Sequence, residues 1–182
     1  MGTINIKQII KEELNNINKI LNLFNSTDLN KYGSIHDYLK YLDTIFSNSK
    51  IKNIVYHGVM NQLAPKDGVF KGYITYFSDN EEYAKTFGFP INRKIIIAKI
   101  NIQRLYYSPS ELADVPEEIH NTDQYTNPRI IKKQMNNFDS VIGIDAGQTN
   151  GKTIAVFDPK QIHILGSKQD IEFFKKYMNN EY

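Results

Sequence analysis

Two short stretches decide the fold: Val-Tyr-His-Gly at residues 55–58 and Gly-Tyr-Ile-Thr-Tyr-Phe-Ser-Asp at residues 72–79. Both are rich in β-branched and aromatic residues and end in turn-forming residues, which is typical of short strands. The second runs directly into Glu-Glu-Tyr-Ala-Lys-Thr-Phe at residues 81–87. Ser78 or Asp79 can cap a helix there, and the early glutamates suit the positive end of its dipole. The two stretches therefore predict a strand and a strand–helix unit that bring His57, Gly58 and Tyr76 to one pocket wall.

A third stretch reads Ile-Ala-Val-Phe-Asp-Pro-Lys-Gln-Ile at residues 154–162. Taken in order, the His-Gly pair, the Tyr-Phe-Ser-Asp run before a helix and this aromatic-Asp-x-x-Gln-Ile ending resemble the ADP-ribosyltransferase fold of the diphtheria-toxin and poly(ADP-ribose) polymerase type. The resemblance covers about residues 54–165. It implies an α+β domain in which two small packed β-sheets surround an NAD cleft, with N-terminal helices before them and a C-terminal helix after.

The resemblance gives roles to individual residues of the first two stretches. His57 is expected to hydrogen-bond a ribose hydroxyl of NAD, and the Gly58 backbone to pair with the carboxamide, since the missing Cβ permits close approach. Tyr76 is expected to stack on the nicotinamide ring. The expected cofactor-binding residues are completed by Phe77, Ser78 and the later aromatic Phe87, whereas Tyr83 is expected in the core.

The catalytic glutamate of the family is missing from its usual place. It holds the ribose and stabilises the cation that develops as nicotinamide leaves; here its position, five residues before the Asp of the third stretch, is Thr153. We count His57, Tyr76 and Thr153 as the catalytic residues, although a threonine offers a hydrogen bond and no charge. Three alternatives stay open: another acid, Asp145 or Glu118, supplies the charge; a carboxylate of the target supplies it; or the protein binds NAD or ADP-ribose without transferring it.

The activity that the resemblance implies is mono-ADP-ribosyl transfer of the toxin or phage-effector type. NAD is cleaved between nicotinamide and ribose as a substrate, ADP-ribose goes to a macromolecular target, and no metal is expected. A target protein is the expected acceptor, with nucleic acid left open. Residues 103–127, which read as loops with short helical turns, are expected to contact it. Lys66 and Lys71 are candidate phosphate neighbours, and Gln161 is expected to be structural.

A chain of 182 residues without an internal repeat predicts one catalytic domain, at residues 51–182, with residues 1–50 as a helical extension packed on its core. The net charge of +2, with basic and acidic residues interspersed, gives no footprint of nucleic-acid binding. The absence of cysteine excludes disulfides, thiolate metal sites and a cysteine nucleophile.

Without a signal-peptide pattern or an apolar run of membrane-spanning length, we expect a soluble, cytoplasmic protein that does not contact membranes. Its oligomeric state is open.

Amphipathic patterns predict three longer helices. Ser34 with Asp37, and Ser167 with Asp170, have the spacing of helix caps and begin two of them. Further strands are expected at residues 94–102, 139–144, 153–158 and 161–165. The first helix carries an apolar stripe that we expect to pack on the domain's own core, with a partner-binding helix as the alternative. The stripe consists of Ile6, Ile9, Ile10, Leu14, Ile17, Ile20, Leu21 and Phe24.

Two other classes of function stay open. Residues 146–153 fit a relaxed phosphate-loop pattern after a strand, as in an NTP-binding protein, but such a loop must open a helix. The residues that follow are β-branched and stopped by Pro159, so we predict a hairpin turn instead. The other class is a pure interaction module in which the first helix binds a partner and the cleft is inactive. The acidic residues at 117–123 have no recognised metal-ligand spacing.

Overall fold

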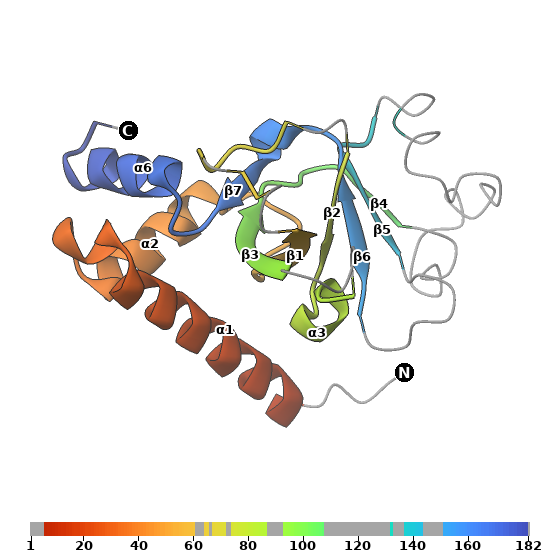
Figure 1. The fold of residues 1–182 in the computed structure, drawn as a ribbon, viewed down its shortest axis with the longest axis horizontal. Coiled ribbons are helices and arrows are strands. Elements are labelled where there is room, and N and C mark those ends of the chain that lie inside the picture. The colour runs from red at the N-terminus through yellow and green to blue at the C-terminus, as the bar shows by residue number, and fades with distance from the viewer. Residues whose placement is uncertain are drawn as a thin grey trace.

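The computed structural model describes residues 6–60, 64–65, 67–71, 74–86, 93–107, 132, 137–143 and 151–181. Helices gather on one side of a sheet (Figure 1). The helices are α1 (Ile6–Ser26), η1 (Asp28–Lys31), α2 (Ile35–Ile45), α3 (Glu81–Ala84), η4 (Pro159–Gln161) and α6 (Lys168–Met178). The strands are β1 (Val55–Met60), β2 (Thr75–Ser78), β3 (Arg93–Ile100), β4 (Leu105–Tyr107), β5 (Ser140–Gly143), β6 (Thr153–Val156) and β7 (Ile162–Ile164).

The strands form one seven-stranded sheet in the order β4-β5-β6-β2-β1-β3-β7. The predicted mixed α and β class is confirmed, but the prediction of two packed sheets is wrong. The reason is one backbone pair, Tyr56 with Ser78, which joins β1 to β2 edge to edge. On either side of this junction the pairing is longer, with six residue pairs between β1 and β3 and four between β2 and β6.

The segment after β3 differs from its predicted irregular structure at its start. Residues 105–107, expected in a loop or helical turn, form β4, which pairs in parallel with β5. Leu105, Tyr106 and Tyr107 are good strand formers, and the partner strand supplies the backbone hydrogen bonds that they need. Residues 108–131, which include the remainder of the proposed acceptor-contacting segment, lie outside the described residues.

A layer of helices covers the sheet beside β1 and β3. Its buried cluster joins α1, α2 and α6 to Ile54 and Tyr56, and Tyr38, Leu29 and Phe174 are fully buried in it. Only part of the predicted α1 stripe belongs to this core. Ile20 and Phe24 are buried, whereas Ile10, Leu14, Ile17 and Leu21 are exposed.

A polar network ties the helical layer together. Asp170 of α6 is fully buried and accepts hydrogen bonds from the Tyr38 hydroxyl at 2.5 Å and the Gly166 N–H at 2.6 Å. His163 Nε2 of β7 lies 2.6 Å from its other carboxylate oxygen. Burial and the nearby Asp170 raise the pKa of Tyr38 well above its usual value. A buried carboxylate with this many donors fixes how α2, α6 and β7 meet.

Two of the three predicted helix starts are confirmed. Ser34 and Asp37 form a capping box, and the Ser167 hydroxyl accepts from the Asp170 N–H. The cap of α3 is instead Asn80, whose side chain accepts from the Tyr83 N–H at 3.1 Å. Ser78 lies two residues before this cap, and its hydroxyl accepts from the Asn80 N–H. Among the described helices, none is both long and apolar enough to cross a membrane.

Candidate functional site at the junction of β1 and β2

His57 lies where the pairing between β1 and β2 ends. Tyr56 pairs with Ser78, but the ladder does not continue to His57 and Gly58. The His57 side chain makes the next link, because its Nδ1 lies 2.6 Å from the carbonyl oxygen of Tyr76. A side chain therefore replaces a backbone hydrogen bond at the point where the strands separate.

This contact fixes the tautomer of His57. A carbonyl oxygen can only accept, so Nδ1 carries the proton and, in the neutral ring, Nε2 keeps its lone pair. Burial lowers the pKa of His57, and the hydrogen bond to Tyr76 opposes the shift. The ring is therefore neutral near pH 7, and Nε2 can accept a hydrogen bond from a hydroxyl group. Within the described ranges, no residue hydrogen-bonds to Nε2.

Two aromatic rings hold the imidazole in place. Phe70 meets it edge-on, with 5.1 Å between ring centroids, and Phe77 lies at 5.5 Å. Phe77 was expected to bind the cofactor; its side chain is fully buried and supports His57 instead. Phe70 was not among the residues predicted from the sequence, although the apolar pair Val69-Phe70 between Gly68 and Lys71 is a signal that could have identified it.

The loop that carries Phe70 is anchored at Gly68. This glycine has φ +82°, and a Cβ placed on it would lie 2.6 Å from Cβ and Oγ of Ser167, the cap of α6. Only glycine adopts this backbone without strain and without a clash. The loop thus connects the start of α6 to the His57 ring.

Tyr76 and Gly58 differ in exposure. Tyr76 is 38% exposed on β2, opposite Ala155 of β6, so its ring offers a surface for stacking. Gly58 is buried on β1 and pairs with Ile95 of β3 on one side only, since the ladder to β2 has ended.

The three sequence stretches meet in one row across the sheet. Tyr56 of β1 pairs with Ser78 of β2, which in turn pairs with Thr153 of β6. Thr153 is half-buried, and its hydroxyl donates to the Tyr83 hydroxyl of α3 at 3.4 Å. The residue before Thr153 is tied to the same place, because the Lys152 N–H donates to Asp79 at 2.8 Å. Tyr83 is buried, as predicted.

The row divides the candidate side chains between the two faces of the sheet. Strand alternation puts Tyr76, Ser78 and Thr153 on the face that carries α3. The His57 ring instead contacts Phe70 and Phe77, which belong to the core of the other face. The His57 ring is therefore brought together with neither the Thr153 hydroxyl nor the Tyr76 ring, although all three were expected to meet one NAD molecule.

Helix α3, which follows β2, contacts α1. Glu81, in the first turn of α3, forms an ion pair with Lys19 of α1. The Lys19 ammonium also lies over the Tyr56 ring, 4.7 Å from its centroid, and burial lowers the pKa of this lysine. The N-terminal helix is thus linked to β1 at the residue before His57.

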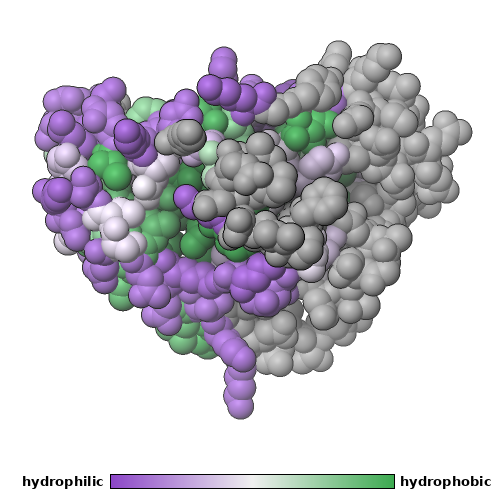
Figure 2. Space-filling model, in the orientation of Figure 1, coloured by the Kyte–Doolittle hydropathy of each residue, from purple (hydrophilic) through white to green (hydrophobic). Residues whose placement is uncertain are grey.

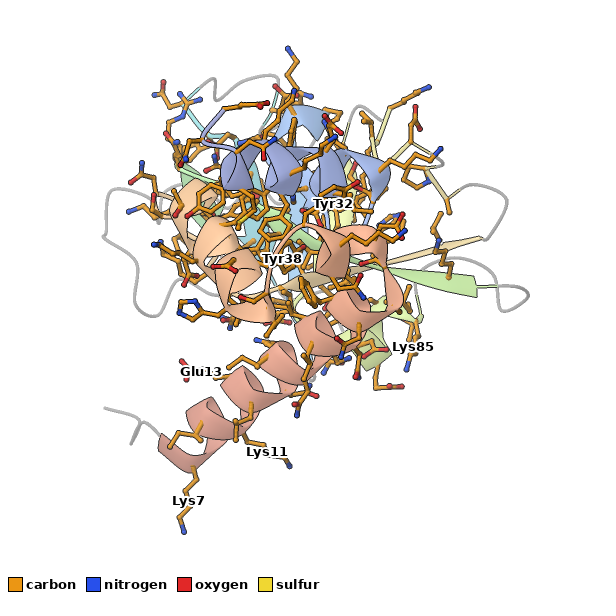
Figure 3. The ribbon with its side chains drawn as sticks, turned by 90° about the vertical axis from the view of Figure 1, so that its left-hand side faces the viewer. Lys7, Lys11, Glu13, Tyr32, Tyr38 and Lys85 are labelled. Carbon is orange, nitrogen blue, oxygen red and sulfur yellow. The ribbon has the colours of Figure 1, made fainter. Side chains whose placement is uncertain are left out.

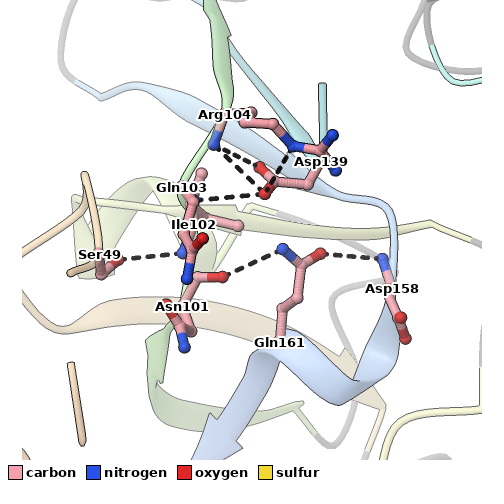
Figure 4. A network of polar contacts seen from close by, with 8 residues as sticks. All are labelled: Ser49, Asn101, Ile102, Gln103, Arg104, Asp139, Asp158 and Gln161. Carbon is pink, nitrogen blue, oxygen red and sulfur yellow. Dashed lines mark hydrogen bonds and ion pairs between the residues drawn. The ribbon is translucent and has the colours of Figure 1, made fainter. Parts of the chain in front are cut away.

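Gln161 has the structural role that we predicted. Its side chain donates to the Asn101 carbonyl at 3.0 Å and accepts from the Asp158 N–H at 3.3 Å (Figure 4). With Asp158 it forms the capping box of η4. The aromatic-Asp-x-x-Gln stretch therefore fixes the turn between β6 and β7.

Several candidate residues lie outside the described residues or away from the junction. Phe87, Lys66, Glu118 and Asp145 are not described. Lys71 is exposed and forms an ion pair with Asp67 at 3.8 Å, so no contact links it to the junction. A depression of about 430 Å³ lies over α2, and none of the candidate residues lines it.

The phosphate-loop alternative fails at its second half. The stretch ends at Thr153, which begins strand β6, so a strand follows where an NTP-binding loop needs a helix. Within the described part of the chain, no group of three or more His, Asp or Glu side chains could hold a metal ion.

Comparison with family models, with curated proteins and with solved structures found no match to this chain.

Proposed function

We propose that the protein binds NAD across the junction of β1 and β2 and acts as a mono-ADP-ribosyltransferase. The observation that carries the proposal is the row Tyr56–Ser78–Thr153, which unites three distant sequence stretches next to His57. Chance matches to three separate motifs would have no reason to meet in register on adjacent strands.

We assign each residue the role that the resemblance implies. His57 is neutral and accepts a hydrogen bond from a ribose hydroxyl at Nε2, because Nδ1 is engaged with Tyr76. The exposed ring of Tyr76 stacks on the nicotinamide, and the backbone of Gly58 binds its carboxamide. The reaction breaks the bond between the nicotinamide nitrogen and the ribose C1′, and the electron pair leaves with nicotinamide. An acceptor nucleophile on a macromolecular target, a protein in the first instance, then bonds to C1′ and loses its proton.

A second function is favoured by one specific observation. Thr153 carries no charge, and its hydroxyl is already engaged with Tyr83. A site that lacks an anion where positive charge develops binds NAD more readily than it cleaves it. NAD or ADP-ribose binding without transfer is therefore the alternative.

Calorimetric titration with NAD, with ATP as the parallel control, tests the proposal. His57→Ala and Tyr76→Ala should each weaken NAD binding about 5- to 10-fold, since each removes one hydrogen bond or one aromatic contact. The chain offers matched controls in His36→Ala, an exposed histidine of α2, and Tyr32→Ala, which is 37% exposed against 38% for Tyr76. Full NAD binding by both site variants would overturn the assignment.

A second measurement separates the two functions. Release of nicotinamide from labelled NAD, together with label retained on a lysate protein, supports transfer. Binding of NAD with no release supports the binding module.

A further inference from the structure

Lys19 of α1 lies close to the point where this helix enters the body of the molecule. Ile20, the next residue, is buried in the same cluster as Tyr56 of β1. The N-terminal half of α1, with Lys7 and Lys11, extends away from the other elements (Figure 3). Lys19 is therefore placed to act on the sheet, whereas the two earlier lysines are not.

The Lys19 side chain contacts two elements at once. Its ammonium lies over the Tyr56 ring, 4.7 Å from the centroid, and forms an ion pair with Glu81 in the first turn of α3. The Lys19 and Glu81 side chains are only 22% and 29% exposed, so water screens their attraction less than it would at an open surface. Hydrophilic residues dominate the lower edge of the space-filling view, where α1 and α3 lie in Figure 1 (Figure 2). Lys19 thus lies at the polar rim of the cluster that buries Tyr56.

The charges around Lys19 come from α3. Among the described residues, Glu81 pairs with Lys19, Glu82 attracts it and Lys85 repels it. Lys85 is itself engaged with Glu82 at 2.5 Å. The residues one turn away from Lys19 on its own helix are all uncharged: Asn15, Asn16, Asn22 and Leu23. The charge of Lys19 therefore acts between α1 and α3, and not within α1.

The two contacts of Lys19 bridge the junction of β1 and β2 from the helical side. Tyr56 belongs to β1, and its pair with Ser78 is the one link between the two strands that the register of the described residues gives. Glu81 follows Ser78 by three residues, at the start of the helix into which β2 leads. Lys19 thus holds β1 directly and β2 through α3, at the place where backbone pairing between them is shortest.

We propose that Lys19 is a positioning residue for the contact between His57 and Tyr76, because it holds β1 and β2 at the spacing that this hydrogen bond needs. Lys19 does not touch the His57 ring. The Tyr56 ring belongs to the helical layer, whereas the His57 ring contacts Phe77 in the core of the other face. Lys19 therefore acts through the backbone of β1. Its effect on NAD binding rests on the proposed function, and its effect on His57 does not.

The ring nitrogens of His57 test the proposal by NMR. In protein labelled with nitrogen-15 histidine, a ring whose proton is fixed on Nδ1 gives signals distinct from those of a ring that exchanges between tautomers. The signals that His57→Gln lacks are those of His57. Lys19→Met keeps the length of the side chain and removes its charge. We expect it to speed exchange of the Nδ1 proton about tenfold, as for the loss of one cation–π contact and one partly exposed ion pair. Lys19→Arg should retain the wild-type signals, since a guanidinium also pairs with a carboxylate and stacks on a ring.

Two matched controls separate positioning from a general loss of charge. Lys11→Met removes an exposed lysine about two turns earlier on α1 and should leave the His57 signals unchanged. Glu81→Gln removes the partner of Lys19 and should speed exchange, which provides a second test if Lys19→Met does not fold. Glu82→Gln, at a side chain that is 79% exposed, should not speed it. Circular dichroism shows whether each variant is folded.

Unchanged His57 signals in a folded Lys19→Met variant overturn the proposal, whatever that variant does to the free energy of unfolding. A Lys19→Arg variant that behaves like Lys19→Met overturns it as well. These signals need no ligand, so they decide the role of Lys19 separately from the question of NAD. In calorimetric titration, Lys19→Met should also weaken NAD binding about tenfold, in step with the loosened His57. Full NAD binding by a variant with altered His57 signals would contradict the role of His57 in the proposed function and leave the positioning role intact.

Discussion

His57 is bonded through Nδ1 to the backbone carbonyl of Tyr76, 2.6 Å away, at the position where β1 and β2 stop pairing. His57 and Tyr76, both chosen from the sequence, thus link β1 to β2 by one hydrogen bond. Because the bond uses Nδ1, the chemistry left to His57 is that of a neutral acceptor at Nε2.

The first prediction concerns pH. Burial lowers the His57 pKa from its usual 6.5, so the ring stays neutral at pH 7 and above. As the pH falls below 6.5 and through the lowered pKa, the ring gains a proton and Nε2 becomes a donor. NAD affinity should therefore be constant from about pH 7 to 8 and fall at lower pH, by at most about tenfold per pH unit.

Titration of NAD across this range measures the effect, with His57→Gln as the control because its amide oxygen accepts but does not titrate. Folding stability should change in the same direction, since the unfolded chain binds the proton first. NAD affinity that rises on acidification would contradict this account of His57.

The second prediction concerns the missing charge. Thr153→Glu restores a carboxylate beside Ser78, within reach of the Tyr83 hydroxyl that Thr153 now contacts. Since negative charge stabilises the cation that forms as nicotinamide leaves, nicotinamide release should rise about tenfold or more. Thr153→Gln has the same shape without the charge and should show no such rise. Equal rates for the two variants would mean that position 153 does not face the reacting atoms.

The third prediction tests the anchored loop. Gly68→Ala forces a side chain into a φ of +82° and against Ser167, so the free energy of unfolding should fall by about 1–3 kcal/mol. Val69→Ala, at the exposed neighbouring position, should change it by less than about 0.5 kcal/mol. Urea denaturation of both variants measures the difference. If Gly68→Ala is as stable as the wild type, the loop is not held against α6.

The fourth prediction concerns the buried polar network. Asp170→Ala leaves donors from Tyr38, His163 and Gly166 without their acceptor, and should cost about 3–5 kcal/mol of unfolding free energy. Tyr38→Phe removes one donor only and should cost about 1 kcal/mol. Glu172→Ala, exposed on the same helix, should be near neutral. A network that tolerates Asp170→Ala as well as Glu172→Ala would not be what fixes the helices.

Helix caps were predictable from the sequence wherever only one side chain stood at the capping position. The Ser34–Asp37 capping box and the Ser167 cap of α6 follow from spacing alone, and both are present. At the start of α3, three consecutive side chains can cap, and the one used is Asn80, which directly precedes the helix. Asp79 instead accepts from the Lys152 N–H, a contact distant in sequence that no local pattern encodes.

Tertiary arrangement was harder to predict because periodicity reports apolar positions but not what covers them. The stripe of α1 spans a wide arc of the helix, and only its C-terminal part, at Ile20 and Phe24, meets the core. The single sheet depends on the Tyr56–Ser78 pair, which joins residues far apart in sequence. At the candidate site, His57 and Tyr76 remain predictions from the sequence, whereas Phe70 was found only through a contact made by a loop.

In the part of the chain that the structure describes, the two edges of the sheet are its shortest strands, β4 (Leu105–Tyr107) and β7 (Ile162–Ile164). A three-residue edge offers few backbone donors and acceptors, so another strand gains little by adding to it. Open sheets form fibres when strands of neighbouring chains pair at their edges. The short edges β4 and β7 disfavour such pairing. Contacts between copies through these two edges are therefore left to side chains rather than to backbone pairing.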